Sequence, residues 1–222
     1  MAAPFDPEFE ELPEEIPIFP LGGALLLPGN RLPLNIFEPR YLNMTAAALA
    51  APQRLIGMIQ PQQEQTGPGE PEIYRTGCVG RIVSFGETED GRYLITLQGL
   101  IRFAVDRELA PRDGYRRVRV RFGAFRDDLA EPAAKIAVDR ERLLNALRAY
   151  LRQQNVDANW EAIEGTEDSR LIDSLAMMCP FRTSEKQALL EAPGTAERAE
   201  IVMTLLEMAL LESPLDEGQT RQ

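Results

Sequence analysis

Short apolar stretches separated by chain-breaking residues dominate the first half of the sequence. From residue 16 to 125, Pro, Gly and Asn divide the apolar runs into strand-length segments, three of which span 79–85, 93–97 and 101–105. The last segment, 117–122, reads Arg-Val-Arg-Val-Arg-Phe, and its period of two is that of a strand with one buried face. An Asp-Gly pair at 90–91 predicts a hairpin. Many short strands at close spacing predict a small closed or half-closed β-barrel.

A single helix interrupts these strands. Pro39 follows Glu38 at what is expected to be the first helical position, where the missing N–H of proline costs no hydrogen bond. The residues after Arg40 favour a helix until Pro52 ends it. The barrel is therefore predicted to contain one inserted helix.

After residue 128 the hydrophobic period changes from two to 3.6. Ile136, Leu143, Leu147 and Tyr150 share one stripe, which predicts a long amphipathic helix over 132–153. Shorter helices are expected over 168–178, 184–192 and 195–211, with proline between them. The second half is thus predicted to be a helical bundle.

The fold class that follows is α+β, with a β pseudo-barrel containing one inserted helix, followed by a C-terminal helical bundle. Residues 1–15 carry six acidic residues, no basic residue and three prolines, which favours a flexible acidic arm. The predicted division is an arm at 1–15, a barrel subdomain at 16–128, a bundle subdomain at 129–212 and a flexible tail at 213–222.

Charge is distributed unevenly along the chain. The 222 residues contain 24 Lys and Arg and 35 Asp and Glu, giving a net charge of −11, which argues against general attraction to nucleic acid or to an anionic membrane. Residues 16–130 hold 14 basic and 12 acidic residues, whereas residues 131–222 hold 10 basic and 17 acidic residues. The acidity therefore belongs to the acidic arm and the bundle, beside a mildly basic barrel.

Several classes of chemistry are excluded or unsupported. The chain has no histidine, which removes His-assisted nucleophiles, His-containing zinc sites and imidazole acid–base catalysis. Its only lysines, Lys135 and Lys186, do not follow glycine, so no GxxxxGK[ST] phosphate loop exists, and there is no GxSxG elbow. We expect no catalytic, cofactor-binding or metal-binding residue, hence no cofactor and no enzyme. With no secretory leader pattern and no membrane-length apolar run, we expect a cytoplasmic protein with no membrane partner.

The strongest candidate from residue chemistry alone is the row of arginines on the last barrel strand. Guanidiniums on alternate positions lie about 7 Å apart and suit carboxylates or successive phosphates. A charged row also protects a strand from aggregation or forms ion pairs, and that interpretation stays open. The candidate partner-binding residues are Arg117, Arg119 and Arg121, together with Arg116 just before them.

Several ordered motifs resemble the N-terminal (LON) domain of Lon proteases. They are Pro17–Leu21 through Leu27-Pro28-Gly29, Leu32–Tyr41, Gly77–Gly80, Asp90–Tyr93, Gly99–Phe103 and Glu185–Glu191. The resemblance implies a PUA-like β pseudo-barrel followed by a helical bundle, and a role in recognising protein substrates. The ATPase and Ser-Lys peptidase modules of Lon have no counterpart here, so the chain looks like a stand-alone bacterial LON-domain protein.

Most of the family motif residues have structural explanations. Pro28 and Gly29 are expected to make a turn, Phe37 and Tyr41 to anchor the first helix against the barrel, and Glu38 and Arg40 to form a local ion pair. The motif residues interpreted as structural are Pro20, Pro28, Gly29, Phe37, Glu38, Arg40, Tyr41 and Gly91.

Two functional hypotheses follow. The first is a non-catalytic protein- or peptide-binding module that uses a groove between barrel and bundle together with exposed barrel strands. The alternative is an RNA-binding PUA-like protein that uses the arginine row, although the net charge counts against it. The expected partner is a polypeptide substrate or partner protein, and a weak homo-oligomer is compatible with the sequence.

Overall fold

The computed structural model describes residues 7–62, 70–130 and 138–211, which form two compact units. The first unit comprises the described part of 1–132 together with 182–190, and the second the described parts of 133–181 and 191–222. Helix α5 (Thr183–Glu191) therefore belongs almost entirely to the first unit, although the sequence pattern had assigned it to the bundle.

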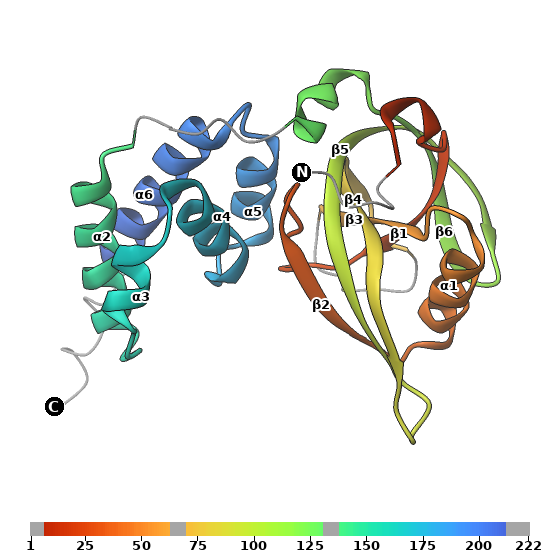
Figure 1. The fold of residues 1–222 in the computed structure, drawn as a ribbon, viewed down its shortest axis with the longest axis horizontal. Helices are drawn as coiled ribbons and strands as arrows, with labels where there is room; N and C mark the ends of the chain where they lie inside the picture. Colours follow the sequence, from red (N-terminus) through yellow and green to blue (C-terminus); the bar gives the residue numbers. More distant parts are fainter. Residues whose placement is uncertain (1–6, 63–69, 131–137, 212–222) are drawn as a thin grey trace, which may run out of the picture. The chain divides into compact units, whose positions relative to one another are not determined.

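The first unit is built on one mixed sheet of six strands (Figure 1). Its strand order is β2-β5-β4-β3-β1-β6, and β5 also pairs with β6. Strands β5, β4, β3, β1 and β6 therefore form a closed ring, and β2 pairs with β5 outside that ring. Among the described strands, only β1 and β3 pair in parallel. The α+β class is confirmed, but the sheet is not a regular barrel, and the PUA-like description stays a prediction. The strands are β1 (Glu15–Pro20), β2 (Arg31–Ile36), β3 (Leu55–Pro61), β4 (Ile73–Glu87), β5 (Tyr93–Arg112) and β6 (Tyr115–Arg121).

Strand β5 is longer than the sequence pattern predicts. The segments expected at 93–97 and 101–105 form one continuous strand, because Gly99 bends the chain without breaking it. A Cβ atom at Gly99 would overlap the carbonyl oxygen of Leu27, so glycine is required by the close approach of two backbones. The register shift opposite Gly80, where Leu100 is the extra residue, absorbs the bend.

Glycine turns join the long strands. The hairpin predicted at Asp90-Gly91 is confirmed, with Gly91 at φ 78° and its N–H donating to Thr88 O at 2.9 Å. A second Asp-Gly pair, which was not predicted as a turn, joins β5 to β6, where Asp113 and Gly114 adopt φ 48° and 86°. Positive φ at both central residues is the geometry that matches the twist of a hairpin.

Residues 7–15 pack on the sheet, where the sequence had predicted a flexible arm over 1–15. A short 3₁₀ helix, η1 (Phe9–Glu11), places Phe9 and Leu12 against the core cluster of the sheet, and Glu15 is already paired in β1. Apolar residues between the acidic ones explain the difference, because their burial offsets the cost of ordering this segment. Residues 1–6 of the predicted arm and the whole predicted tail at 213–222 lie outside the described residues.

Two helices and a 3₁₀ segment complete the first unit. Helix α1 (Pro39–Ala50) is the predicted inserted helix and buries Tyr41, Met44 and Ala48. Helix α5 is held by buried polar groups: Lys186 Nζ donates to Gly23 O at 2.6 Å, and Gln187 Nε2 donates to Thr76 O at 3.1 Å. The 3₁₀ segment η2 (Gly123–Leu129) follows β6.

The described residues of the second unit contain four helices. They are α2 (Arg140–Gln153), α3 (Trp160–Gly165), α4 (Asp168–Met178) and α6 (Thr195–Leu211). The ranges predicted for α4 and α6 are confirmed, whereas α3 was not predicted. Helix α2 begins at Arg140, because the Asp139 side chain accepts a hydrogen bond from Arg142 N and caps the helix there. Residues 138–139 are therefore not helical, and 132–137 lie outside the described residues.

Candidate functional site

The predicted arginine row lies on β6, which is not a sheet edge. β6 pairs with β1 on one side and β5 on the other, so Val118 and Val120 face the core. Arg117 and Arg119 lie next to the Glu15 carboxylate, at 2.9 Å and 3.2 Å, so one acid serves both guanidiniums. The neighbouring strand therefore supplies the counter-charge for this part of the row.

The two outer arginines differ in how firmly they are held. Arg116 forms a two-point pair with Glu108, at 2.6 and 3.1 Å, and donates to Pro71 O at 2.8 Å. Arg121 has an exposed side chain and lies 3.5 Å from Asp106. Arg116 thus joins segments of the first unit, and Arg121 is the member of the row most accessible to a ligand.

A groove of about 770 Å³ runs beside the end of β6. Arg119 and Arg121 line it together with the apolar side chains of Phe9, Leu12 and Phe122. Its charge is balanced, since Glu14 and Asp106 are also in the lining. The groove is therefore amphipathic, with no excess of positive charge that would favour a phosphate backbone.

Most of the predicted structural residues at the start of α1 form a packed cluster. The rings of Phe19 and Tyr41 lie 4.1 Å apart, and the Arg40 guanidinium lies 4.6 Å from the centre of the Tyr41 ring. Arg40 pairs with Glu38 at 3.1 Å and with Glu70 at 2.7 Å. Burial raises the pKa of the Tyr41 hydroxyl. The ion pair that the sequence predicts between Glu38 and Arg40 is present in the structure.

The turn residues of the motif also take structural positions, with one exception in the set. Gly29 adopts φ 77° and its N–H donates to Gly99 O at 2.9 Å, while Pro20 is the last residue of β1. The carbonyl oxygen of Pro28 accepts a hydrogen bond from the Asn30 side chain.

Phe37 was expected to anchor α1, but 60% of its surface is exposed. Strand β2 ends at the buried Ile36, so Phe37, the next residue, lies outside the paired ladder and is not covered by the core.

Phe37 belongs to an exposed apolar region on a projecting part of the sheet. We call "the sheet extension" the region formed by β2 with the adjoining Phe37, residues 82–87 of β4 and residues 93–98 of β5. The hairpin between β4 and β5 projects past the other strands in Figure 1. Phe85 and Leu94 are 46% and 48% exposed, and Val83 is also exposed. Large apolar side chains gathered on one exposed element mark a surface for interaction.

The strand register shows which faces of the sheet extension these side chains occupy. Directly opposed residues share a face, so Leu34, Ile95 and Phe85 form one cross-strand row. The row continues to Tyr93, whose ring packs edge-on against Phe85 with 5.1 Å between centroids. Ile95 is buried, while Leu34 and Tyr93 are half-buried. This face therefore passes gradually from the core to solvent.

The opposite face of the sheet extension carries Phe37 and Leu94. Leu94 pairs with Asn35, and Phe37 lies two residues after Asn35, directly beyond the end of β2. The Arg92 guanidinium lies 5.8 Å from the centre of the Phe37 ring. We define the extension patch as Phe37, Phe85, Tyr93 and Leu94. It offers apolar contacts on both sides of a thin sheet.

Strand β2 borders this patch with an edge that no other described strand pairs with. The edge carries Pro33, a residue confined to sheet edges because it lacks an N–H for the ladder. Proline on an edge also limits uncontrolled pairing with other chains. An extended segment can therefore add to β2 only along part of its length.

Comparison with known families fits this arrangement. The family model described as the ATP-dependent protease La (LON) substrate-binding domain matches residues 15–208. The chain belongs to this family. Lon protease 2 of Myxococcus xanthus is 29% identical over 204 residues, covering 89% of this chain and 24% of that protein. Lon protease 2 of Thermus thermophilus is 28% identical over 207 residues, covering 91% of this chain and 25% of that protein.

Solved LON-family structures share the fold. A Lon N-terminal domain protein from Xanthomonas campestris matches with a TM-score of 0.55 and 23% identity, over 86% of this chain and 97% of that one. The N-terminal domain of the Mycobacterium avium complex Lon protease matches with a TM-score of 0.55 and 17% identity, over 90% and 100%. The chain spans about a quarter of the length of the curated Lon proteases it matches.

Two absences hold for the described residues. Nowhere among them do three side chains of the metal-binding types gather as a metal site. Within the same ranges, no helix has the length and apolar content needed to cross a membrane.

The sequence pattern did not point to Phe85, Tyr93 or Leu94 as functional residues. Each lies in a segment that was predicted as a strand or beside one, and each was taken as part of the barrel. A strand pattern does not reveal which part of a hairpin extends past the core. No local signal in the sequence could therefore have identified these three residues as exposed.

Proposed function

We propose that this chain is a non-catalytic module that binds exposed apolar segments of other polypeptides through the extension patch. The observation on which this rests is the exposure of Phe37 and Leu94 on one face of the sheet extension and of Phe85 on the other. Membership of a substrate-binding family supports a polypeptide as the ligand. The sequence contains no phosphate loop and no histidine, which supports a role without catalysis.

The expected binding is weak. Burying the exposed half of an aromatic side chain contributes about 1–2 kcal/mol. The three aromatic residues of the extension patch and Leu94 together contribute about 5 kcal/mol, while association itself costs at least about 4 kcal/mol. Backbone hydrogen bonds along the open edge of β2 add to the interaction and tolerate many side-chain sequences. Such a surface suits capture of unfolded segments that have little sequence in common.

The RNA-binding alternative has less support. Arg116, Arg117 and Arg119 each lie against a carboxylate, so a phosphate would have to displace existing ion pairs. The net charge of −11 also opposes binding of a polyanion.

A cytoplasmic location is part of the proposal, and the buried thiols of Cys78 and Cys179 fit a reducing compartment.

The test uses a permanently unfolded polypeptide, reduced and carboxymethylated α-lactalbumin, with a fluorescent label. Its anisotropy should rise on titration with the full chain, with a dissociation constant of about 0.1 mM or weaker. Phe37→Ser and Phe85→Ser should each weaken binding about tenfold, which corresponds to the loss of about 1.4 kcal/mol. The matched controls are Val156→Ser and Met178→Ser, which remove exposed apolar side chains in the second unit.

Two results would contradict the proposal. Equal weakening by the Phe37 and Phe85 variants and by the controls would mean that binding is not localised to the sheet extension. Unchanged binding in the Phe37→Ser/Phe85→Ser double variant, with its circular dichroism spectrum intact, would exclude the extension patch as the site.

A further inference from the structure

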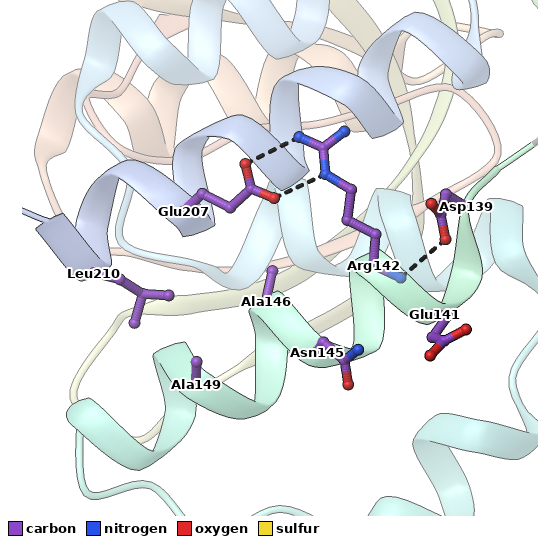
Figure 2. Close-up of a pocket in the computed structure, with 8 residues that line it drawn as sticks. All are labelled: Asp139, Glu141, Arg142, Asn145, Ala146, Ala149, Glu207 and Leu210. Atoms are coloured by element: carbon purple, nitrogen blue, oxygen red, sulfur yellow. Dashed lines mark hydrogen bonds and ion pairs between the residues drawn. The ribbon is translucent and has the colours of Figure 1, made fainter.

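A second concave surface lies in the helical unit, between α2 and α6. This groove has a volume of about 510 Å³, and Figure 2 shows its lining. Asp139, Glu141 and Arg142 lie toward one end, while Ala149 and Leu210 lie at the other. The groove therefore has a charged end and an apolar end.

Helix α6 explains why the apolar end exists. Val202, Met203 and Leu206 are buried within the unit, yet Met208 is 45% and Leu211 is 84% exposed. The last ten residues of α6, 202–211, contain only Thr204 and Glu207 as polar residues. A helix that is apolar on all sides normally has cover on all sides. This end of α6 has an apolar face beyond the one that its own unit buries.

The cationic group of the groove is already neutralised. Arg142 donates to both carboxylate oxygens of Glu207, at 2.8 and 2.9 Å (Figure 2). It also donates to Glu200 at 3.2 Å. Asp139 and Glu141 remain on the rim as further acids. The described residues of this unit, 138–181 and 191–211, hold 6 basic and 12 acidic residues, a net charge of −6. The field at the groove therefore favours a cationic ligand.

The walls of the groove determine the backbone conformation of an occupant. Both walls are α-helices, whose backbone N–H and C=O groups are used internally and cannot pair with a strand. A segment that docks here must satisfy its own backbone hydrogen bonds, which a helix does. The small side chain of Ala149 on α2, which is only half-buried, lets a third helix approach closely.

We propose that the α2–α6 groove binds a basic amphipathic helix of a partner protein, with apolar residues against Ala149 and Leu210 and lysine or arginine beside the acidic rim. A second copy of this chain is disfavoured as the occupant, because its own helical unit is equally acidic. The inference does not depend on the extension patch, which lies in the other unit and takes a different ligand.

The probe is a synthetic fluorescent peptide with leucines on one helical face and lysines on the other, titrated with the full chain. A peptide with glutamate in place of lysine, and a scrambled peptide without a continuous leucine face, serve as comparisons. Binding of the Leu/Lys peptide should weaken about fivefold in Glu141→Lys, because a rim charge is reversed. It should weaken about tenfold in Leu210→Ser, because an apolar contact is lost.

Matched controls separate local from general effects. Glu161→Lys changes the net charge of the same unit by the same amount but lies on α3, and Met178→Ser removes an exposed apolar side chain from α4. Both controls should bind like the parent protein. Equal weakening by Glu141→Lys and Glu161→Lys, or equal binding of the lysine and glutamate peptides, would overturn the proposal. Sedimentation that shows a dimer abolished by Leu210→Ser would also overturn it, since a second copy would then cover the groove.

Discussion

Removal of the Asp128 carboxylate should strongly destabilise the first unit. Arg102 is only 7% exposed, and its guanidinium binds Asp128 at 2.7 and 2.8 Å. The Arg102 backbone N–H donates to the same carboxylate at 2.9 Å, and Nη1 donates to Leu190 O at 3.1 Å. This cluster therefore joins β5, η2 and α5. The hydrogen bonds to Asp128 raise the pKa of Arg102, which stays charged when its partner is lost.

The magnitude follows from the burial of the remaining charge. Removing one partner of a buried ion pair costs about 3–5 kcal/mol, because the other charge is left desolvated and unpaired. Asp128→Ala should therefore lower the urea midpoint by about 1.5–2.5 M, for a denaturant slope of about 2 kcal/mol per M. The double variant Arg102→Met/Asp128→Ala should be more stable than Asp128→Ala alone, since it buries no unpaired charge.

Urea unfolding followed by circular dichroism measures the change. The fluorescence of Trp160, the single tryptophan, follows the second unit separately. A loss below about 1 kcal/mol in Asp128→Ala would show that solvent reaches the pair and that the burial argument is wrong. Equal stability of the single and double variants would refute the claim that the unpaired guanidinium causes the loss.

Two further predictions concern a backbone contact and an ion pair. Gly99→Ala should destabilise the first unit by about 1–3 kcal/mol or more, because the added Cβ would overlap the carbonyl oxygen of Leu27. Gly86→Ala is the control and should not destabilise the unit, since a Cβ at Gly86 would have no atom within 4 Å. Equal urea midpoints for the two variants would contradict the overlap argument. Arg142 lowers the pKa of Glu207 from its ordinary 4.5, so the pair stabilises the fold at neutral pH and that contribution is lost as the pH falls through the lowered pKa. Glu207→Gln should therefore melt below the parent protein at pH 7, and the difference in melting temperature should shrink as the pH is lowered below 4.5. A difference that does not change with pH would exclude the ion pair as its cause.

Local patterns predicted the elements well because their signals lie in adjacent residues. Pro39 at the start of α1 and the Asp90-Gly91 turn are read from backbone preferences that tertiary packing did not override. Gly99 shows the limit of the same reasoning. A glycine in a strand pattern indicates either a break or a close approach, and only the position of Leu27, distant in sequence, decides between them.

The candidate site was harder to predict because it depends on what each face of a strand meets. Arg117 and Arg119 form a clear row in the sequence, but their counter-charge, Glu15, lies about a hundred residues away. Phe37 belongs to a family motif and was expected to anchor the first helix against the barrel. Its exposure follows from the sheet extension projecting past the closed part of the sheet, which is a property of the whole topology.

The most direct test of polypeptide binding at the sheet extension is amide hydrogen exchange on the full chain, with and without saturating carboxymethylated α-lactalbumin. Binding at the extension patch predicts slower exchange in residues 31–37, 83–87 and 92–96, with the strongest effect along β2, whose edge is open among the described strands. Protection confined to other segments, with exchange in these three unchanged while the ligand is bound, would contradict the central claim.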